Sequence, residues 1–145
     1  MKILVVCLGN ICRSPLAHGI LAHLVKEKGL DWEIDSAGTG DWHVGECPDR
    51  RSIAIAKKYG VDISGQRARQ FNRIDFEYYD KILVMDRNNL RDVLAMAHSP
   101  ADRAKVSLFL ENDIVQDPYY DNNLFDPVYK IIAARCETLL KELAS

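Results

Sequence analysis

The sequence lacks a hydrophobic run long enough to cross a bilayer, so we expect no membrane insertion. It also lacks an excess of either charge, because 19 basic and 21 acidic residues leave a net charge of −2. No electrostatic argument therefore favours nucleic acid or an anionic membrane surface as a partner. Lys2 and the apolar residues after it superficially resemble a signal peptide, but Asn10 and Arg13 interrupt the apolar stretch. We expect a cytoplasmic protein.

The cysteines lack the spacings that mark common cysteine-based sites. The chain has four of them, at Cys7, Cys12, Cys47 and Cys136. No C-x-x-C pair is present, which argues against a thioredoxin-like oxidoreductase, and the spacing does not suit a zinc site. A chain of 145 residues can bury a core without disulfides. The cysteines must therefore be explained by reactivity or by packing.

What the sequence does have is an alternation of buried strands and helices. Apolar runs predict strands at residues 2–6, 32–35, 81–85 and 106–110. Helical spacing predicts helices that begin near Pro15, Pro48, Arg87 and Pro127. Ser14, Asp86 and Asp126 are the expected caps, and Gly29 and Gly60 the expected stops. This order predicts one α/β domain over residues 1–145, an open parallel four-stranded sheet with helices on both faces.

The stretch VCLGNICRSP, residues 6–15, joins the first strand to the first helix. Ligands bind at the carboxyl ends of parallel strands, and the free N–H groups of a helix N-terminus favour an anion. Gly9 permits close backbone approach, and the planar fork of Arg13 can hold two phosphate oxygens. A helix N-terminus and an arginine also stabilise a thiolate at Cys7. The stretch predicts a phosphate-binding loop with a nucleophile suited to attack on phosphorus.

A thiolate that expels an alkoxide or phenolate needs a general acid. The loop aspartates available for this role are Asp41, Asp86, Asp117 and Asp121. Asp117 is favoured because Pro118 stiffens its loop, and because the next two residues, Tyr119 and Tyr120, offer an aromatic wall.

VCLGNICRSP resembles, residue for residue, the active-site loop of the low molecular weight protein tyrosine phosphatases. Similar segments follow in the family's order at residues 35–49, 68–70, 85–90 and 117–123, so the resemblance covers nearly the whole chain. It implies hydrolysis of phosphotyrosine monoesters through a cysteinyl-phosphate, without metal or cofactor. Cys7 would be the nucleophile, Arg13 the phosphate clamp and Asp117 the general acid and then base.

The resemblance also implies a set of substrate-binding residues. They are Leu8, Gly9, Asn10, Ile11, Cys12, Ser14, Trp42, Tyr119 and Tyr120. Asn10, supported by Ser36, would hold the shape of the loop, and Ser14 would donate to the Cys7 thiolate. Cys12 either packs under the loop or forms a disulfide with an oxidised Cys7. Cys47 and Cys136 are expected to be bystanders.

The substrate depends on the walls of the pocket. Leu8, Ile11, Trp42 and Tyr119 are expected to form a slot that admits a flat phenyl ester and is too deep for phosphoserine. Some members of the wider fold family act on phosphoarginine and carry threonine where this chain has Ile11, so a phosphoarginine phosphatase is the main alternative. We expect phosphotyrosine-containing proteins as partners and leave the oligomeric state open between monomer and weak dimer.

Two further alternatives are less consistent with the sequence. Arsenate reductase on this scaffold needs additional cysteines in the middle of the chain, and residues 80–95 contain none. A non-enzymatic phosphate-binding module would explain the loop but not the stretch from Asp117 to Tyr120.

Some residues receive no functional assignment. Some relatives carry a histidine near the position of Gln66, where it supports the loop asparagine, so whether Gln66 makes that contact is left open here. The histidines, His18, His23, His43 and His98, are expected on the surface or a helix face. The basic stretches at residues 49–51 and 67–69 are expected to be solvated.

Overall fold

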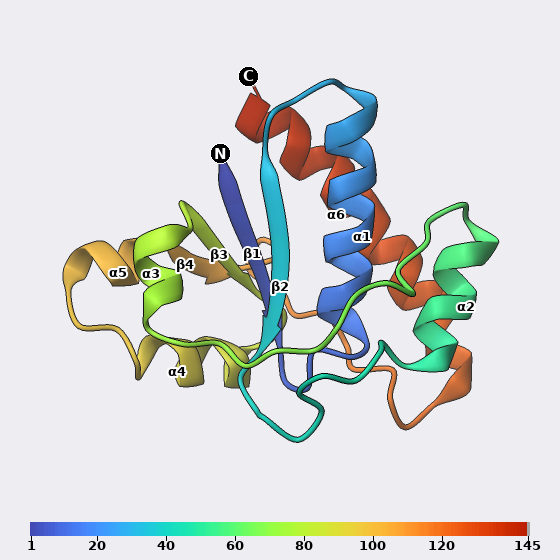
Figure 1. The fold of residues 1–145 in the computed structure, drawn as a ribbon, viewed down its shortest axis with the longest axis horizontal. Coiled ribbons are helices and arrows are strands. Elements are labelled where there is room, and N and C mark those ends of the chain that lie inside the picture. The colour runs from blue at the N-terminus through green and yellow to red at the C-terminus, as the bar shows by residue number, and fades with distance from the viewer. Residues whose placement is uncertain (145) are drawn as a thin grey trace.

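Four parallel strands form one sheet in the order β2-β1-β3-β4 in the computed structural model, which describes residues 1–144 (Figure 1). The strands are β1 (Lys2–Cys7), β2 (Glu33–Gly38), β3 (Lys81–Val84) and β4 (Val106–Leu108). β1 lies in the middle, with Cys7 beside Gly38 of β2 and Val6 beside Val84 of β3. The predicted open parallel sheet is confirmed, although β2 runs three residues beyond the expected Asp35.

Side chains alternate between the two faces of the sheet, as the period of a strand requires. Ile3, Val5 and Cys7 pack with the helices α1 (Arg13–Glu27), α2 (Arg50–Lys58) and α6 (Phe125–Ala144). Leu4 and Val6 pack on the opposite face, with α3 (Ile74–Tyr78) and α4 (Arg87–Leu94). The short helix α5 (Pro100–Ala104) contacts β4, and the 3₁₀ turn η1 (Asn122–Leu124) precedes α6. Burial on both faces explains why the strands are continuous apolar runs.

Some helix boundaries match the expected signals. Asp86 caps α4 through a capping box with Asn89. Gly29 and Gly60 follow α1 and α2 with φ angles of 64° and 84°, the left-handed region that glycine adopts without strain. These predictions are confirmed.

Two expected caps are wrong. α1 begins at Arg13 with Cys12 at the N-cap position, and the Ser14 hydroxyl is directed to Cys7 and Asn10. α6 begins at Phe125, and Asp126 accepts a hydrogen bond from Tyr59 instead of capping. α3 and α5 were not expected, because five residues are too few to show helical periodicity.

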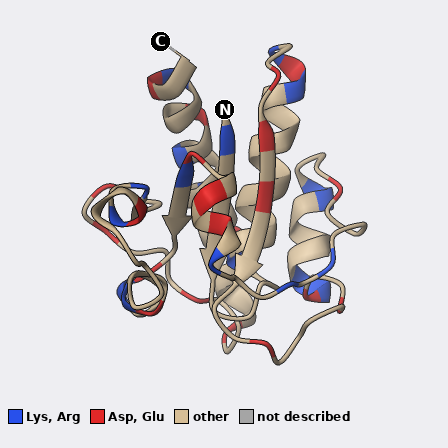
Figure 2. Ribbon diagram, turned by 60° about the vertical axis from the view of Figure 1, so that its left-hand side comes forward, with Lys and Arg blue, Asp and Glu red and all other residues tan. Residues whose placement is uncertain are grey.

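Basic and acidic residues are interspersed over the helices and loops of residues 1–144 (Figure 2). None of the helices in that range is long and apolar enough to cross a membrane.

Candidate active site

The loops that follow β1, β2 and β4 meet at the carboxyl edge of the sheet and surround a pocket of about 240 Å³. It is lined by Cys7, Leu8, Gly9, Ile11, Cys12, Arg13, Trp42, His43, Asp117, Tyr119 and Tyr120. The three residues predicted to be catalytic are thus brought together. Asn10 and Ser14, predicted to bind substrate, are buried and do not line the pocket. His43 also lines the pocket, which was not expected from the sequence.

Asn10 holds the phosphate-binding loop in shape from the buried side, away from the pocket. Its φ of 58° is in the left-handed region, which asparagine tolerates better than most residues. Its Nδ2 donates to Ser14 Oγ at 2.8 Å and to Ser36 Oγ at 3.0 Å, and its Oδ1 accepts from the Arg69 N–H at 3.0 Å. The expected contact between Asn10 and Ser36 is present.

The Asn10 amide leaves both serine hydroxyls a hydrogen to donate. Asn10 supplies one N–H to each serine oxygen, so each hydroxyl keeps its own hydrogen for another acceptor. Cys7 Sγ lies 3.0 Å from Ser14 Oγ, and the serine is the donor when the sulfur is a thiolate, which has no hydrogen of its own. His18 Nδ1 lies 3.1 Å from Ser36 Oγ.

His18 accordingly has a structural role that the sequence did not reveal. Burial lowers its pKa, and the charge of Arg69 acts in the same direction, against the opposing effects of Asp35 and Gln66. A neutral ring suits an acceptor nitrogen. His18 lies on the face of helix α1, as one of the two expectations had it, and its contact with Ser36 was not expected. Gln66 donates to Pro15 O at 3.1 Å instead of supporting Asn10, whose remaining partner is the Arg69 backbone.

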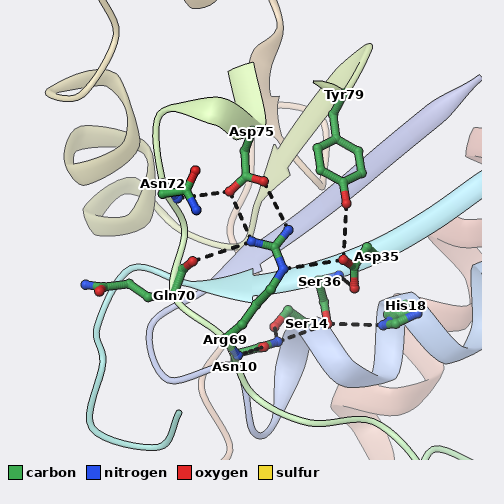
Figure 3. A network of polar contacts seen from close by, with 10 residues as sticks. All are labelled: Asn10, Ser14, His18, Asp35, Ser36, Arg69, Gln70, Asn72, Asp75 and Tyr79. Atoms are coloured by element: carbon green, nitrogen blue, oxygen red, sulfur yellow. Dashed lines mark hydrogen bonds and ion pairs between the residues drawn. The ribbon is translucent and has the colours of Figure 1, made fainter. Parts of the chain in front are cut away.

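Arg69 is fixed by carboxylates on two elements (Figure 3). Its guanidinium donates twice to Asp75 at 3.1 Å and once to Asp35 at 3.4 Å. Burial opposes its charge, but these carboxylates prevail and raise the pKa of Arg69. Tyr79 donates to Asp35 at 3.1 Å, and burial followed by the Asp35 charge raises the pKa of Tyr79. The network holds the backbone N–H that Asn10 requires, so Arg69 is not a solvated surface residue.

Arg13 lies at the floor of the pocket and is 2% exposed. Its Nη1 donates to Asp86 Oδ2 at 2.7 Å and to Val115 O at 2.9 Å. Burial opposes the charge, but Cys7 and Asp86 prevail and raise the pKa of Arg13. Nε and Nη2 make no hydrogen bond with residues 1–144, which leaves them available to an anion in the pocket. Asp86, an expected cap, is also the partner that orients the arginine.

Asp117 is the one of the four candidate acids that lines the pocket. Its Oδ2 lies 3.8 Å from Arg13 Nη2, and its Oδ1 accepts from the Tyr119 N–H at 3.1 Å. Asp121 instead accepts from the Asn123 N–H and caps η1. Trp42 and Tyr120 are 67% and 91% exposed, which places them at the mouth of the pocket. Asp117 can therefore reach both a bound ester and water.

Cys12 shares the pocket with Cys7. Burial and the negative charges of Asp49 and Cys7 raise the pKa of Cys12 to about 12, so it is a thiol at neutral pH. All four cysteines are free. The expected disulfide between an oxidised Cys7 and Cys12 stays a prediction.

The family model described as "Low molecular weight phosphotyrosine protein phosphatase" matches residues 2–145. The protein is thus an α/β phosphoric monoester hydrolase. More particularly, the chain belongs to the low molecular weight phosphotyrosine protein phosphatase family.

Individual relatives match this chain over nearly its whole length. The family member of Sus scrofa is 37% identical, with 98% of this chain and 95% of the relative covered. A protein tyrosine phosphatase structure from Entamoeba histolytica has a TM-score of 0.93 at 31% identity, with 99% and 97% of the two chains covered. The structure of a Drosophila arginine phosphatase has a TM-score of 0.91 at 36% identity, with 100% and 99% covered.

Proposed function

We propose that the protein hydrolyses phosphotyrosine in proteins through a cysteinyl-phosphate, with Cys7 as nucleophile, Arg13 as phosphate clamp and Asp117 as general acid and base. The observation that carries this proposal is that Cys7, Arg13 and Asp117 line one pocket. A serine hydroxyl is aimed at the sulfur, and unused guanidinium N–H groups lie beside it.

In the first step the Cys7 thiolate attacks phosphorus, and the sulfur–phosphorus bond forms as the bond to the tyrosine oxygen breaks. Asp117 transfers its proton to that oxygen, and tyrosine leaves. In the second step the Asp117 carboxylate takes a proton from water, which attacks phosphorus and releases phosphate. Ser14 donates to the sulfur and stabilises it as the departing thiolate.

Arg13 and the backbone N–H groups at the start of α1 stabilise the charge on the phosphoryl oxygens throughout. Asp86 and Val115 fix one end of the guanidinium, so the other end meets the anion without losing rotamer entropy at the moment of binding.

The pocket walls favour a phenyl ester. Leu8, Ile11 and Tyr119 present apolar and aromatic surface above the phosphate loop. Ile11 gives no hydroxyl where phosphoarginine-specific members carry threonine. Phosphoarginine is the second candidate substrate, because the chain is 36% identical to the Drosophila arginine phosphatase.

The test is phosphate release from matched phosphotyrosine, phosphoserine and phosphoarginine substrates, with EDTA present. We expect release from phosphotyrosine, loss of turnover in Cys7→Ser, and full activity in Cys47→Ser, which removes an exposed cysteine outside the pocket. Quenching the wild type during turnover should leave one phosphoryl group on Cys7, detected by mass spectrometry. Preferential release from phosphoarginine would make phosphoarginine the substrate in place of phosphotyrosine. Turnover in Cys7→Ser would overturn the mechanism.

A further inference from the structure

Arg51, expected from the sequence to be solvated, connects two loops of the pocket. Its side chain is 34% exposed. Nε and Nη2 form a two-pronged bond to the carboxylate of Asp49, at 3.0 and 2.9 Å. Nη1 donates to Asn122 Oδ1 at 2.7 Å. One guanidinium thus uses both edges of its fork on two partners that lie 73 positions apart in the chain.

The faces of the same guanidinium contact aromatic rings. Its Cζ lies 4.6 Å from the ring centre of Phe125 and 5.3 Å from that of Tyr119. Phe125 is buried, and Tyr119 lines the pocket. Both distances are within the range of a cation–π contact. Arg51 therefore contacts the segment 119–125 through the side-chain amide of Asn122 and the rings of Tyr119 and Phe125.

The other partner of Arg51 is attached to the phosphate loop. The Asp49 N–H donates to Ile11 O at 2.8 Å. Hydrogen bonds to Arg51 keep the pKa of Asp49 low although burial would raise it, so the carboxylate remains charged. Contacts therefore run from Ile11 through Asp49 and Arg51 to the segment that follows Asp117.

That segment has few other anchors. At one end Val115 is held by Arg13 Nη1 at 2.9 Å and by the Met85 carbonyl at 2.8 Å. Of residues 116–121, only Pro118 is buried. Arg51 contacts the opposite end at Tyr119, Asn122 and Phe125, so Asp117 lies between two arginine anchors.

We propose that Arg51 is a positioning residue that fixes the distance between the phosphate loop and the loop carrying Asp117 and Tyr119. This inference rests on the proposed role of Asp117 as general acid. Loss of Arg51 should let that loop move away from the leaving-group oxygen. The nucleophile and the phosphate clamp, which Arg51 does not contact, should stay in place.

The dependence on leaving group separates this role from a general structural one. Phenyl phosphate releases a basic phenolate that needs a proton, whereas 2,4-dinitrophenyl phosphate releases a stable anion that does not. For Arg51→Ala we expect kcat/KM to fall about tenfold on phenyl phosphate and less than about twofold on 2,4-dinitrophenyl phosphate. Arg51→Lys should resemble Arg51→Ala, because lysine lacks the fork and the flat face.

Arg50→Ala is the matched control, because it removes the same charge from the neighbouring, exposed residue, and it should change neither rate. Asp117→Asn supplies the reference for complete loss of the acid. Equal losses on both esters in Arg51→Ala, or full rescue by lysine, would overturn the inference.

The reference variant also separates this inference from the proposed function. A selective loss in Asp117→Asn without one in Arg51→Ala would leave the function standing and refute the role of Arg51. No selective loss in Asp117→Asn would refute the acid assignment and this inference with it.

Discussion

The two sides of the pocket are built differently. On the phosphate-loop side, Cys7 and Arg13 are 3% and 2% exposed, and each has a hydrogen-bond partner that is itself fixed. On the opposite side, the Asp117 side chain is 38% exposed and Tyr120 is 91% exposed. The first side is held by a buried network, and the second by contacts at its ends.

The difference matches two physical requirements. Binding and stabilising a phosphoryl anion is most effective with fixed donors shielded from water, because a lower dielectric strengthens each interaction. In the proposed mechanism Asp117 acts first as an acid and then as a base, so it must instead meet water and exchange protons with it. A rigid anion site can therefore face an open acid loop in one pocket.

The largest expected effect tests the rigid side. Arg13→Lys should lower kcat/KM for phosphotyrosine by about a thousandfold, because a point charge cannot bind phosphate with a fork while also satisfying Asp86 and Val115. Steady-state kinetics measures this. Arg87→Lys, an exposed arginine next to Asp86, is the control and should be neutral. A loss of less than tenfold in Arg13→Lys would mean that charge alone suffices.

An intermediate effect is expected at Asn10. Asn10→Ala should lower the free energy of unfolding by about 3 kcal/mol, since it leaves the part-buried Arg69 N–H without its acceptor and puts alanine in the left-handed region. It should also slow turnover, because the Ser14 hydroxyl is no longer oriented toward Cys7. Urea denaturation and kinetics on the same preparation measure both effects.

Asn112 is a matched control, because it has a φ of 56° and is exposed. Asn112→Ala should cost only about 1 kcal/mol, the backbone part of the effect. Equal costs in the two variants would show that the network behind the loop contributes nothing to stability.

The smallest expected effect concerns His18. Its pKa is lowered below the ordinary value of 6.5, so the unfolded chain takes up a proton more readily than the folded one. Stability should therefore fall as the pH drops through about 6.5, and His18→Gln should flatten that fall. The measurement is the unfolding free energy of both proteins at pH values on either side of 6.5.

The groups around His18 are unchanged in this comparison. They are Asp35, Arg69, Gln66 and the groove residues His23, Lys26 and Asp62. His98→Gln, which changes an exposed histidine, should leave the pH dependence as in the wild type. An identical slope in His18→Gln and wild type would contradict the assigned direction of the pKa.

The sequence by itself determined the parallel α/β sheet and the position of the loop between β1 and α1. Both are local properties, because strand and helix periodicity span neighbouring residues, and Cys7 and Arg13 are joined by one short loop. Reliance on neighbouring residues alone also led to two wrong predictions of helix caps. A serine before a proline predicts a cap, but Ser14 is turned away by its contacts with Cys7 and Asn10.

Only the tertiary structure decided what holds the site. Arg13 meets Asp86 and Val115 across 73 and 102 positions, and Arg51 meets Asn122 across 71. The sequence pointed to Arg13 but not to its partners, and it made Arg51 look like ordinary surface charge, because no periodic pattern relates these arginines to residues so far away. Asp86 follows β3, which pairs with β1, and Asn122 precedes α6, which packs on α1 and α2, so the tertiary structure brings these partners together. Burial of the Arg13 guanidinium then makes its pairing necessary.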